Sequence, residues 1–187
     1  DVSADSNTIE DGGTETDQQN IDGEGEFLTV KNSSTLATGA TTKAANVTGD
    51  SVTVTVESGS TISANTVAVF GDTTSDLTVT NSGTITASGT TAIDAKATTN
   101  ATITNNSGGT ISSNRNTIRV SKTTGVGAAN TTGMTITNSG TITATNGSAI
   151  FGSAAGNTVT ITNNAGGEMT NSDSDNATIR VGASSSV

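Results

Sequence analysis

Short runs in which apolar residues alternate with Thr or Ser recur along most of this 187-residue chain. Aligned with one another, these runs place their apolar residues in three columns, separated by turns rich in Asn, Gly and Ser. The first column contains Val30, Val56, Val79, Ile103, Ile136 and Ile161. The second column contains Leu36, Ile62, Ile85, Ile111, Ile142 and Met169. The third column contains Val69, Ile93, Ile118, Ile150 and Ile179, with Val47 as its least regular member.

The phrase TVTNSGTITA at residues 78–87 returns as TITNSGTITA at residues 135–144, and it shows the repeating unit most clearly. Alternation with a period of two is typical of a strand whose apolar residues point inward. One coil cannot bury its apolar side alone, whereas stacked coils bury theirs against their neighbours. The pattern predicts an all-β fold, a single parallel β-helix (β-solenoid) of about six coils with three short strands per coil and a period of about 24 residues. Crossover chirality favours the right-handed form.

The distribution of charge divides the chain in two. Nine of the 17 acidic residues lie within residues 1–26, and no Lys or Arg precedes Lys31. We therefore expect an acidic N-terminal arm over residues 1–24, either mobile or able to donate a strand, followed by the β-helix over residues 25–187. The longest first-column spacing predicts a loop insertion at about residues 121–130.

Asn recurs at one corner of the repeat. Its members are Asn32, Asn81, Asn105, Asn138 and Asn163. Stacked Asn side chains can hydrogen-bond along the axis of such a fold, which predicts a structural ladder. The alternative is that each Asn only tolerates the backbone conformation of a turn.

The composition removes most catalytic chemistry. The chain contains no Cys, His, Pro, Trp or Tyr, so it has no thiol nucleophile, imidazole base or zinc site. Aromatic platforms for sugar rings are lacking too, so we expect a protein that is not an enzyme and has no catalytic residues. A net charge of −10 argues against nucleic acid as a partner. No apolar run approaches the roughly 20 residues of a transmembrane helix.

One acidic stretch has the spacing of part of a calcium-binding loop. Asn20, Asp22 and Glu24 alternate as oxygen ligands do in such a loop, but Lys31 stands where a bidentate Glu belongs. A solvated acidic segment is the alternative, and on that interpretation the chain carries no metal or other cofactor.

Two outward surfaces are candidates for contact with a partner. A stripe just after the third column contains Phe70, Asp94, Arg119, Phe151 and Arg180. This stripe is either a contact patch or a place where the Phe rings fold over a corner and cap the core. Asp94 and Arg119 fall at one position in successive coils, which predicts a surface ion pair.

The second surface is a face of paired Thr residues. It contains Thr78, Thr80, Thr102, Thr104, Thr135, Thr137, Thr160 and Thr162. Such a grid resembles the ice-binding faces of β-solenoid antifreeze proteins. The alternative is that Thr is present because it favours strands. Lys31 and Glu57 are expected to interrupt the face in the first two coils.

The phrases TNSGTITA and TNNSGGTI resemble coils of autotransporter passenger domains and related bacterial surface adhesins with β-helical stalks. The resemblance covers residues 27–185. It implies export to the outer surface and a role in adhesion, aggregation or matrix formation. Because the chain begins at Asp1, we also expect a secreted or cell-surface protein from which a leader has been removed.

These observations lead to one principal functional hypothesis, a non-enzymatic extracellular β-solenoid that acts as an adhesive surface or scaffold rod. The alternative is a subunit of a self-assembled extracellular filament or matrix fibre, and the third hypothesis is an ice-binding protein. The expected partners are other copies of the chain, end to end or side by side, or a ligand on a host or cell surface.

Overall fold

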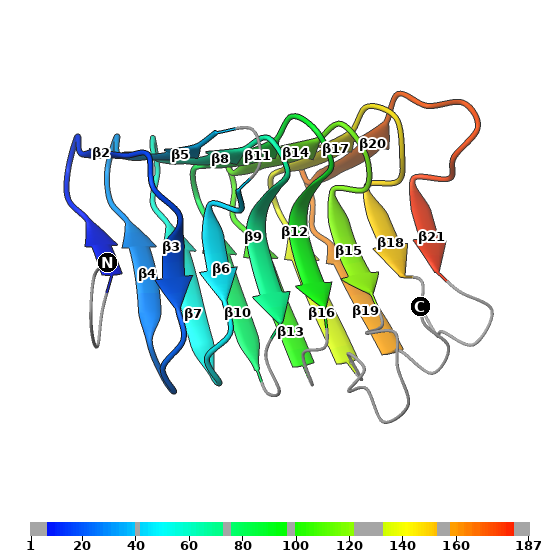
Figure 1. Cartoon of the computed structure of the whole chain (residues 1–187). Helices are drawn as coiled ribbons and strands as arrows, with labels where there is room; N and C mark the ends of the chain where they lie inside the picture. Colours follow the sequence, from blue (N-terminus) through cyan, green and yellow to red (C-terminus); the bar gives the residue numbers. More distant parts are fainter. Residues whose placement is uncertain are drawn as a thin grey trace.

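The computed structural model is a stack of coils whose strands form three parallel sheets (Figure 1). It describes residues 7–39, 42–72, 76–96, 100–121, 133–152 and 158–181. Within these residues each sheet has seven strands, and none of them is helical. The predicted parallel β-solenoid with three strands per coil is therefore confirmed. The predicted loop insertion at about 121–130 lies almost wholly outside the described residues.

Each coil contributes one strand to each of the sheets, which we call sheets A, B and C. Sheet A contains β1 (Asn7–Ile9), β4 (Phe27–Val30), β7 (Val52–Val56), β10 (Leu77–Asn81), β13 (Asn100–Asn105), β16 (Gly133–Asn138) and β19 (Thr158–Asn163). Sheet B contains β2 (Thr14–Glu15), β5 (Thr35–Thr38), β8 (Thr61–Ala64), β11 (Thr84–Ala87), β14 (Thr110–Ser113), β17 (Thr141–Ala144) and β20 (Glu168–Asn171). Sheet C contains β3 (Gln19–Ile21), β6 (Ala45–Val47), β9 (Val67–Asp72), β12 (Thr91–Lys96), β15 (Ile118–Ser121), β18 (Ile150–Gly152) and β21 (Ile179–Val181).

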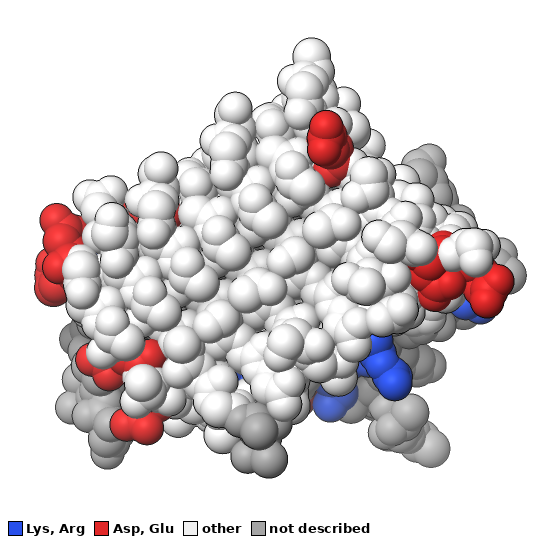
Figure 2. All heavy atoms as spheres, turned by 90° about the horizontal axis from the view of Figure 1, so that it is seen from above, with Lys and Arg blue, Asp and Glu red and all other residues white. Residues whose placement is uncertain are grey.

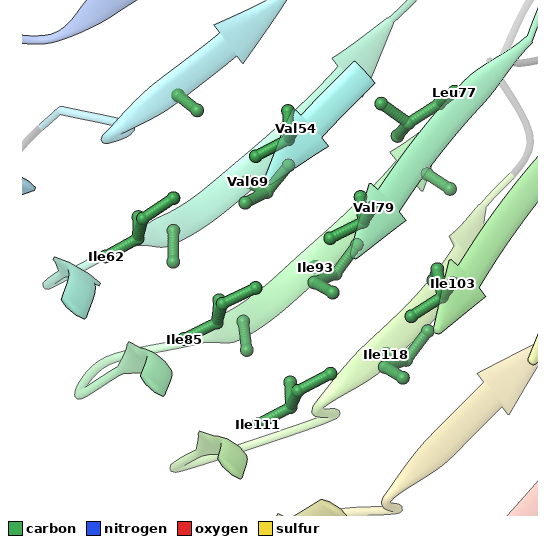
Figure 3. Packing of buried hydrophobic residues seen from close by; sticks show 14 of the residues in the cluster. Val54, Ile62, Val69, Leu77, Val79, Ile85, Ile93, Ile103, Ile111 and Ile118 are labelled. Carbon is green, nitrogen blue, oxygen red and sulfur yellow. The ribbon is translucent and has the colours of Figure 1, made fainter. Parts of the chain in front are cut away.

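The core is a set of aliphatic columns that run along the axis of the stack. In Figure 3, labelled side chains from all three sheets point inward, as Val79, Ile85 and Ile93 do in one coil. All three are 0% exposed, because the coils on either side cover them. Burying an aliphatic side chain of this size contributes about 1.5–3 kcal/mol, so the repeated column is the main stabilising term of the fold.

The coil count and the period differ from those predicted. Seven strands per sheet exceed the expected six coils, because residues 7–21 supply an additional strand to every sheet. The first and last strands of sheet B begin at Thr14 and Glu168, which gives a mean spacing of about 26 residues instead of 24. The mean is higher mainly because one spacing, the 31 residues from Thr110 to Thr141, contains the segment predicted as an insertion.

The acidic segment over residues 1–24 is not a separate arm where the structure describes it. Its strands β1, β2 and β3 pair in parallel with β4, β5 and β6. Ile9 and Ile21 are buried, at 6% and 0% exposed, whereas Glu10 and Asp11 lie exposed beside them. This pairing agrees with the strand-donating alternative for the segment, although two isolated apolar positions among many acidic residues did not indicate a full coil in the sequence pattern.

In the early members of the first column, the observed register differs by two residues from the register that the sequence pattern predicts. Val79 lies beside Val54, and Asn81 lies beside Val56. The second column has the expected register throughout. In the third column, Ala45 rather than Val47 lies beside Val69. A shift of two residues keeps every side chain on the same face of a strand, so alternation alone cannot detect it.

Turn length explains that shift. The turn after β7 is two residues longer than the turn after β10, and Gly59 adopts a φ of +78° within it. Gly108 and Gly166 repeat this conformation in the two turns that contain an additional Gly. Ser33 takes the same left-handed region without being a glycine, with φ of +59°. The turn at residues 57–60 therefore belongs with these longer turns.

The predicted inward and outward positions can be tested with two neighbouring substitutions in β13. Ile103→Asp should destabilise the protein by more than about 4 kcal/mol, because it buries an unpaired charge. Thr104→Asp, on the outward side, should cost about 1 kcal/mol or less. Urea unfolding followed by circular dichroism measures both. Equal losses would show that the inward and outward faces are assigned wrongly.

Candidate functional site

The repeated Asn forms a ladder of side chains inside one corner of the solenoid. Its members end four consecutive strands of sheet A, and they are Asn81, Asn105, Asn138 and Asn163. Each Nδ2 donates to Oδ1 of the next Asn along the axis, with an N···O distance of 2.8 Å in all three cases. Each Nδ2 also donates to a turn carbonyl, as Asn105 does to Gly109 at 3.2 Å. The ladder thus joins each turn to the end of its sheet A strand through side-chain hydrogen bonds.

Asn32 does not belong to this ladder. It lies exposed in the turn after β4, where its backbone N–H donates to the Glu57 carboxylate at 3.2 Å. Val30 and Val56 fill the ladder position in β4 and β7, so the prediction for Asn32 was wrong by the same two-residue shift. Oδ1 of Asn81, which faces this apolar end, has no hydrogen-bond partner in the described part of the chain. Because three of its four members are buried, the ladder supports the fold and is not a contact surface.

The predicted stripe is a continuous outward row on sheet C. Adjacent strands place its members side by side in the order Phe70, Asp94, Arg119, Phe151 and Arg180. At its centre the Asp94 carboxylate accepts hydrogen bonds from Nε of Arg119, at 3.0 Å, and from Nη2 of Arg119. The Asp94 side chain is 1% exposed and that of Arg119 is 36% exposed. This hydrogen-bonded carboxylate raises the pKa of Arg119 above its ordinary value.

Two lysines that the sequence pattern did not single out cover the first ring of this stripe. Nζ of Lys43 lies 3.3 Å from the centroid of the Phe70 ring, and Nζ of Lys96 lies 5.7 Å from it. Lys43 also donates to Oδ1 of Asn46 at 2.9 Å, and burial lowers its pKa. Lys96 pairs with Asp72 at 3.5 Å. Lys96 stands two residues after Asp94, on the same side of β12, and this spacing is a signal that could have found it.

The two outward Phe rings are therefore held by cations and do not form an open apolar patch. Phe70 is 9% exposed and lies outside the aliphatic core cluster. Phe151 is partly exposed, with the Arg180 guanidinium 5.7 Å from its centroid. Cation–π contacts of this kind contribute roughly 0.5–2 kcal/mol each, which suits a stabilising role for the stripe.

The predicted Thr face lies on the outer side of sheet A and is larger than the sequence indicated. Its four predicted rungs are aligned in register from β10 to β19. The grid continues into earlier coils through Thr53 and Thr55 of β7. One column passes through all seven strands, and its members are Thr8, Thr29, Thr55, Thr80, Thr104, Thr137 and Thr162. The other column contains Thr53, Thr78, Thr102, Thr135 and Thr160, and it begins at Phe27.

These two columns of Thr are called the Thr grid below. Lys31 and Glu57 do not interrupt it, because both residues lie in turns beyond the ends of β4 and β7. That expectation was wrong for the same reason as the Asn32 prediction. Asp76 lies at the opposite margin, where its carboxylate accepts a hydrogen bond from Nδ2 of Asn100 at 2.8 Å.

Sheet B presents a second hydroxyl-rich face that the sequence reasoning missed. Figure 2 looks onto this side of the molecule, and Asp and Glu appear only towards its margins. One column contains Thr14, Thr35, Thr61, Thr84, Thr110 and Thr141. The next contains Ala37, Ser63, Thr86, Ser112, Thr143 and Thr170. Two shallow hollows of about 260 and 300 Å³, which share Thr86 and Ser88, lie where this face meets the following turns.

The described residues contain no group of three or more Asp or Glu side chains placed to hold a metal ion. Asn20, the first of the candidate calcium ligands, uses Oδ1 to accept hydrogen bonds from Gln18 at 2.7 Å and Asn46 at 3.1 Å. The calcium interpretation of Asn20, Asp22 and Glu24 remains a prediction. No described helix is long and apolar enough to cross a membrane.

Comparison with protein-family models, curated proteins and solved structures found no match to this chain.

The contribution of the Asn ladder to stability can be measured at its middle and at its end. Asn105→Ala should destabilise the protein by roughly 1–3 kcal/mol, because it removes the acceptor of Asn81 Nδ2 and the donor to Asn138 Oδ1 inside a buried corner. Asn163→Ala lies at the exposed end of the ladder, where water can reach the group that loses its partner. It should therefore lower the free energy of unfolding clearly less than Asn105→Ala does. Urea unfolding of both variants provides the comparison. Equal, small losses would show that each Asn only suits a turn.

Proposed function

We propose that this protein is a non-enzymatic extracellular β-solenoid, a rod that presents repeating hydroxyl-rich faces as an adhesive surface or scaffold. The observation that carries the proposal is the outer surface of sheets A and B, where Thr, Ser and Ala repeat from coil to coil without a charged side chain between β5 and β17. A face of this kind offers many equivalent weak contacts to another surface, and repeated contacts add up to avidity.

The construction of the rod suits this role. Every inner strand is hydrogen-bonded on both edges, so the outer side chains stand on a stiff support. Seven strands at a spacing of about 4.8 Å give a distance of about 29 Å between the first and last strands. We retain right-handed winding as part of the proposal. The extracellular location and the autotransporter-like role are supported by the resemblance of the repeated TNSGTITA phrase.

The proposal is tested by displaying the full chain on a laboratory bacterium that neither clumps nor adheres. Cells that carry the folded chain should clump or adhere to a solid surface more than cells without it. Thr84→Lys, which places a charge in the middle of sheet B, should reduce this effect while the far-ultraviolet circular dichroism of the purified variant stays unchanged. Cells displaying the unfolded Ile103→Asp variant serve as the control. No difference between the wild-type chain and this control would refute an adhesive role.

A second function, subunit of a self-assembled filament, is favoured by the C-terminal coil. Strands β19, β20 and β21 are the last strands of their sheets, and their outer edges have no partner strand among the described residues. Ile179 is 38% exposed, whereas Ile150 and Ile118 in the same column are 0% exposed. Ile161 and Met169 are also less buried than the residues stacked beneath them. An open sheet edge beside apolar side chains is a template for stacking.

Axial stacking would bring the C-terminal coil against the acidic N-terminal coil of another copy. Glu10, Asp11, Glu15 and Asp17 are exposed there and repel the carboxylates of Glu168 and Asp175 at neutral pH and low salt. Electron microscopy should therefore show single rods in neutral dilute buffer and filaments in acid or high salt. Ile179→Lys should keep the rods single in every condition. Single rods of the wild-type chain throughout would exclude the filament.

A further inference from the structure

We propose that a hollow on the outer face of sheet A binds a neutral sugar unit. The hollow has a volume of about 370 Å³ and lies over the neighbouring strands β10, β13 and β16 (Figure 1). Its lining includes Asp76, Thr78, Asn100, Thr102, Gly133 and Thr135. The inference rests on the proposed function, because it names the class of ligand that one outer face of the rod holds.

A single glycine creates this hollow. Parallel pairing places Gly133 of β16 between Asn100 of β13 and Thr158 of β19. Both neighbours carry outward side chains, whereas Gly133 carries none, so the row of outward side chains has a gap at this position. A Cβ atom added to Gly133 would have one atom within 4 Å beyond the adjoining residues of the chain, Oδ1 of Asn100 at 3.0 Å. The gap is therefore open, and a carbonyl oxygen forms its wall.

Asp76 sets the direction of the Asn100 amide. Nδ2 of Asn100 donates to Oδ1 of Asp76 at 2.8 Å. A carboxylate can only accept, so the NH₂ group of the amide faces Asp76 and its Oδ1 turns towards Gly133. One side of the hollow therefore presents acceptor oxygens from a carboxylate and from a carboxamide.

The other side of the hollow is a row of Thr side chains. Thr78, Thr102 and Thr135 lie side by side on consecutive strands. Within the described ranges, no side-chain hydrogen bond engages the hydroxyl groups of these three residues. Each hydroxyl can therefore both donate to a ligand and accept from it. The methyl groups beside them offer apolar surface to the C–H groups of a ligand.

This combination of groups favours a ligand that is rich in hydroxyl groups. Sugar hydroxyls can donate to the oxygens of Asp76 and Asn100 and can exchange hydrogen bonds with the Thr row. A volume of about 370 Å³ lies within the range of about 300–1,000 Å³ that is typical of sites for small organic molecules. Asp76 is the single charged residue in the lining, which falls short of the several carboxylates that usually hold a divalent cation.

The affinity of one hollow for one sugar is expected to be weak. No aromatic side chain is among the residues that line the hollow in the described part of the chain, so the ring has no platform to stack on. Many copies of the rod on one surface would compensate, because repeated weak contacts add up to avidity.

The test is saturation-transfer difference NMR on the purified full chain. The probes are D-glucose, D-galactose, D-mannose and N-acetyl-D-glucosamine at millimolar concentration, and at least one of them should receive saturation from the protein. Gly133→Val should abolish this signal, because the new side chain fills the gap and displaces the Asn100 oxygen. Asp76→Asn should weaken binding about tenfold, because it replaces a charged acceptor by a neutral one.

Thr137→Val is the matched control, since it places the same side chain on the same face of β16 but outside the hollow, and it should keep the signal. Circular dichroism and thermal unfolding establish that every variant is folded. Absence of transfer to all four sugars would overturn the proposal. Equal loss in Gly133→Val and Thr137→Val would overturn the assignment to the hollow.

Two further measurements test the class of ligand. Displacement of the sugar by ethylammonium chloride, at a concentration at which sodium chloride has no effect, would overturn the choice of a neutral ligand. A signal that appears only with added calcium would also overturn it, because the metal would then be the group that the protein holds. Adherence of displayed cells to a solid surface is measured without free sugar, so failure of sugar binding and failure of the adhesive rod are separate results.

Discussion

Each coil of this chain depends on contact with the next coil, because no coil can enclose its own apolar side chains. Val79, Ile85 and Ile93 are fully buried only because the coils before and after them supply equivalent residues. Parallel pairing brings equivalent positions together, so any residue type that repeats in the sequence becomes a column in space. The apolar core, the Asn ladder and the Thr grid are three results of this one constraint.

A column could be predicted where its members lie at a fixed distance after a turn, whatever the length of that turn. The second column was found in its true register because Leu36, Ile62 and Ile85 are each the second residue of a sheet B strand after the corner. The first column failed at Val56, since a turn two residues longer leaves the alternation of the strand intact. Gly59 in the longer turn has a positive φ and Gly83 in the shorter turn does not, but the sequence shows Gly in both.

Contacts between equivalent positions of successive coils were easier to predict than contacts between positions that are not equivalent. Asp94 and Arg119 occupy one position of the repeat, and the structure brings them together. Lys43 reaches Phe70 from the segment that precedes β6, and no periodicity connects these two residues. The N-terminal coil was missed for another reason: Ile9 and Ile21 are too few to outweigh the acids around them, although the stack beside them buries both.

The direction of the Asn ladder has a consequence for how such a chain can lengthen. Asn105 and Asn138 each donate Nδ2 to the next member and accept from the one before, so an amide in the middle of the row has both of its ladder hydrogen bonds. A duplicated coil with Asn at that position would lie between two other members of the ladder and would make a side-chain hydrogen bond to each of them. From Asn81 onward, a coil added by gene duplication therefore leaves no additional buried polar group unpaired. Between the coils that carry Val30 and Val56, an added coil with Asn at this position would place its amide against a methyl group.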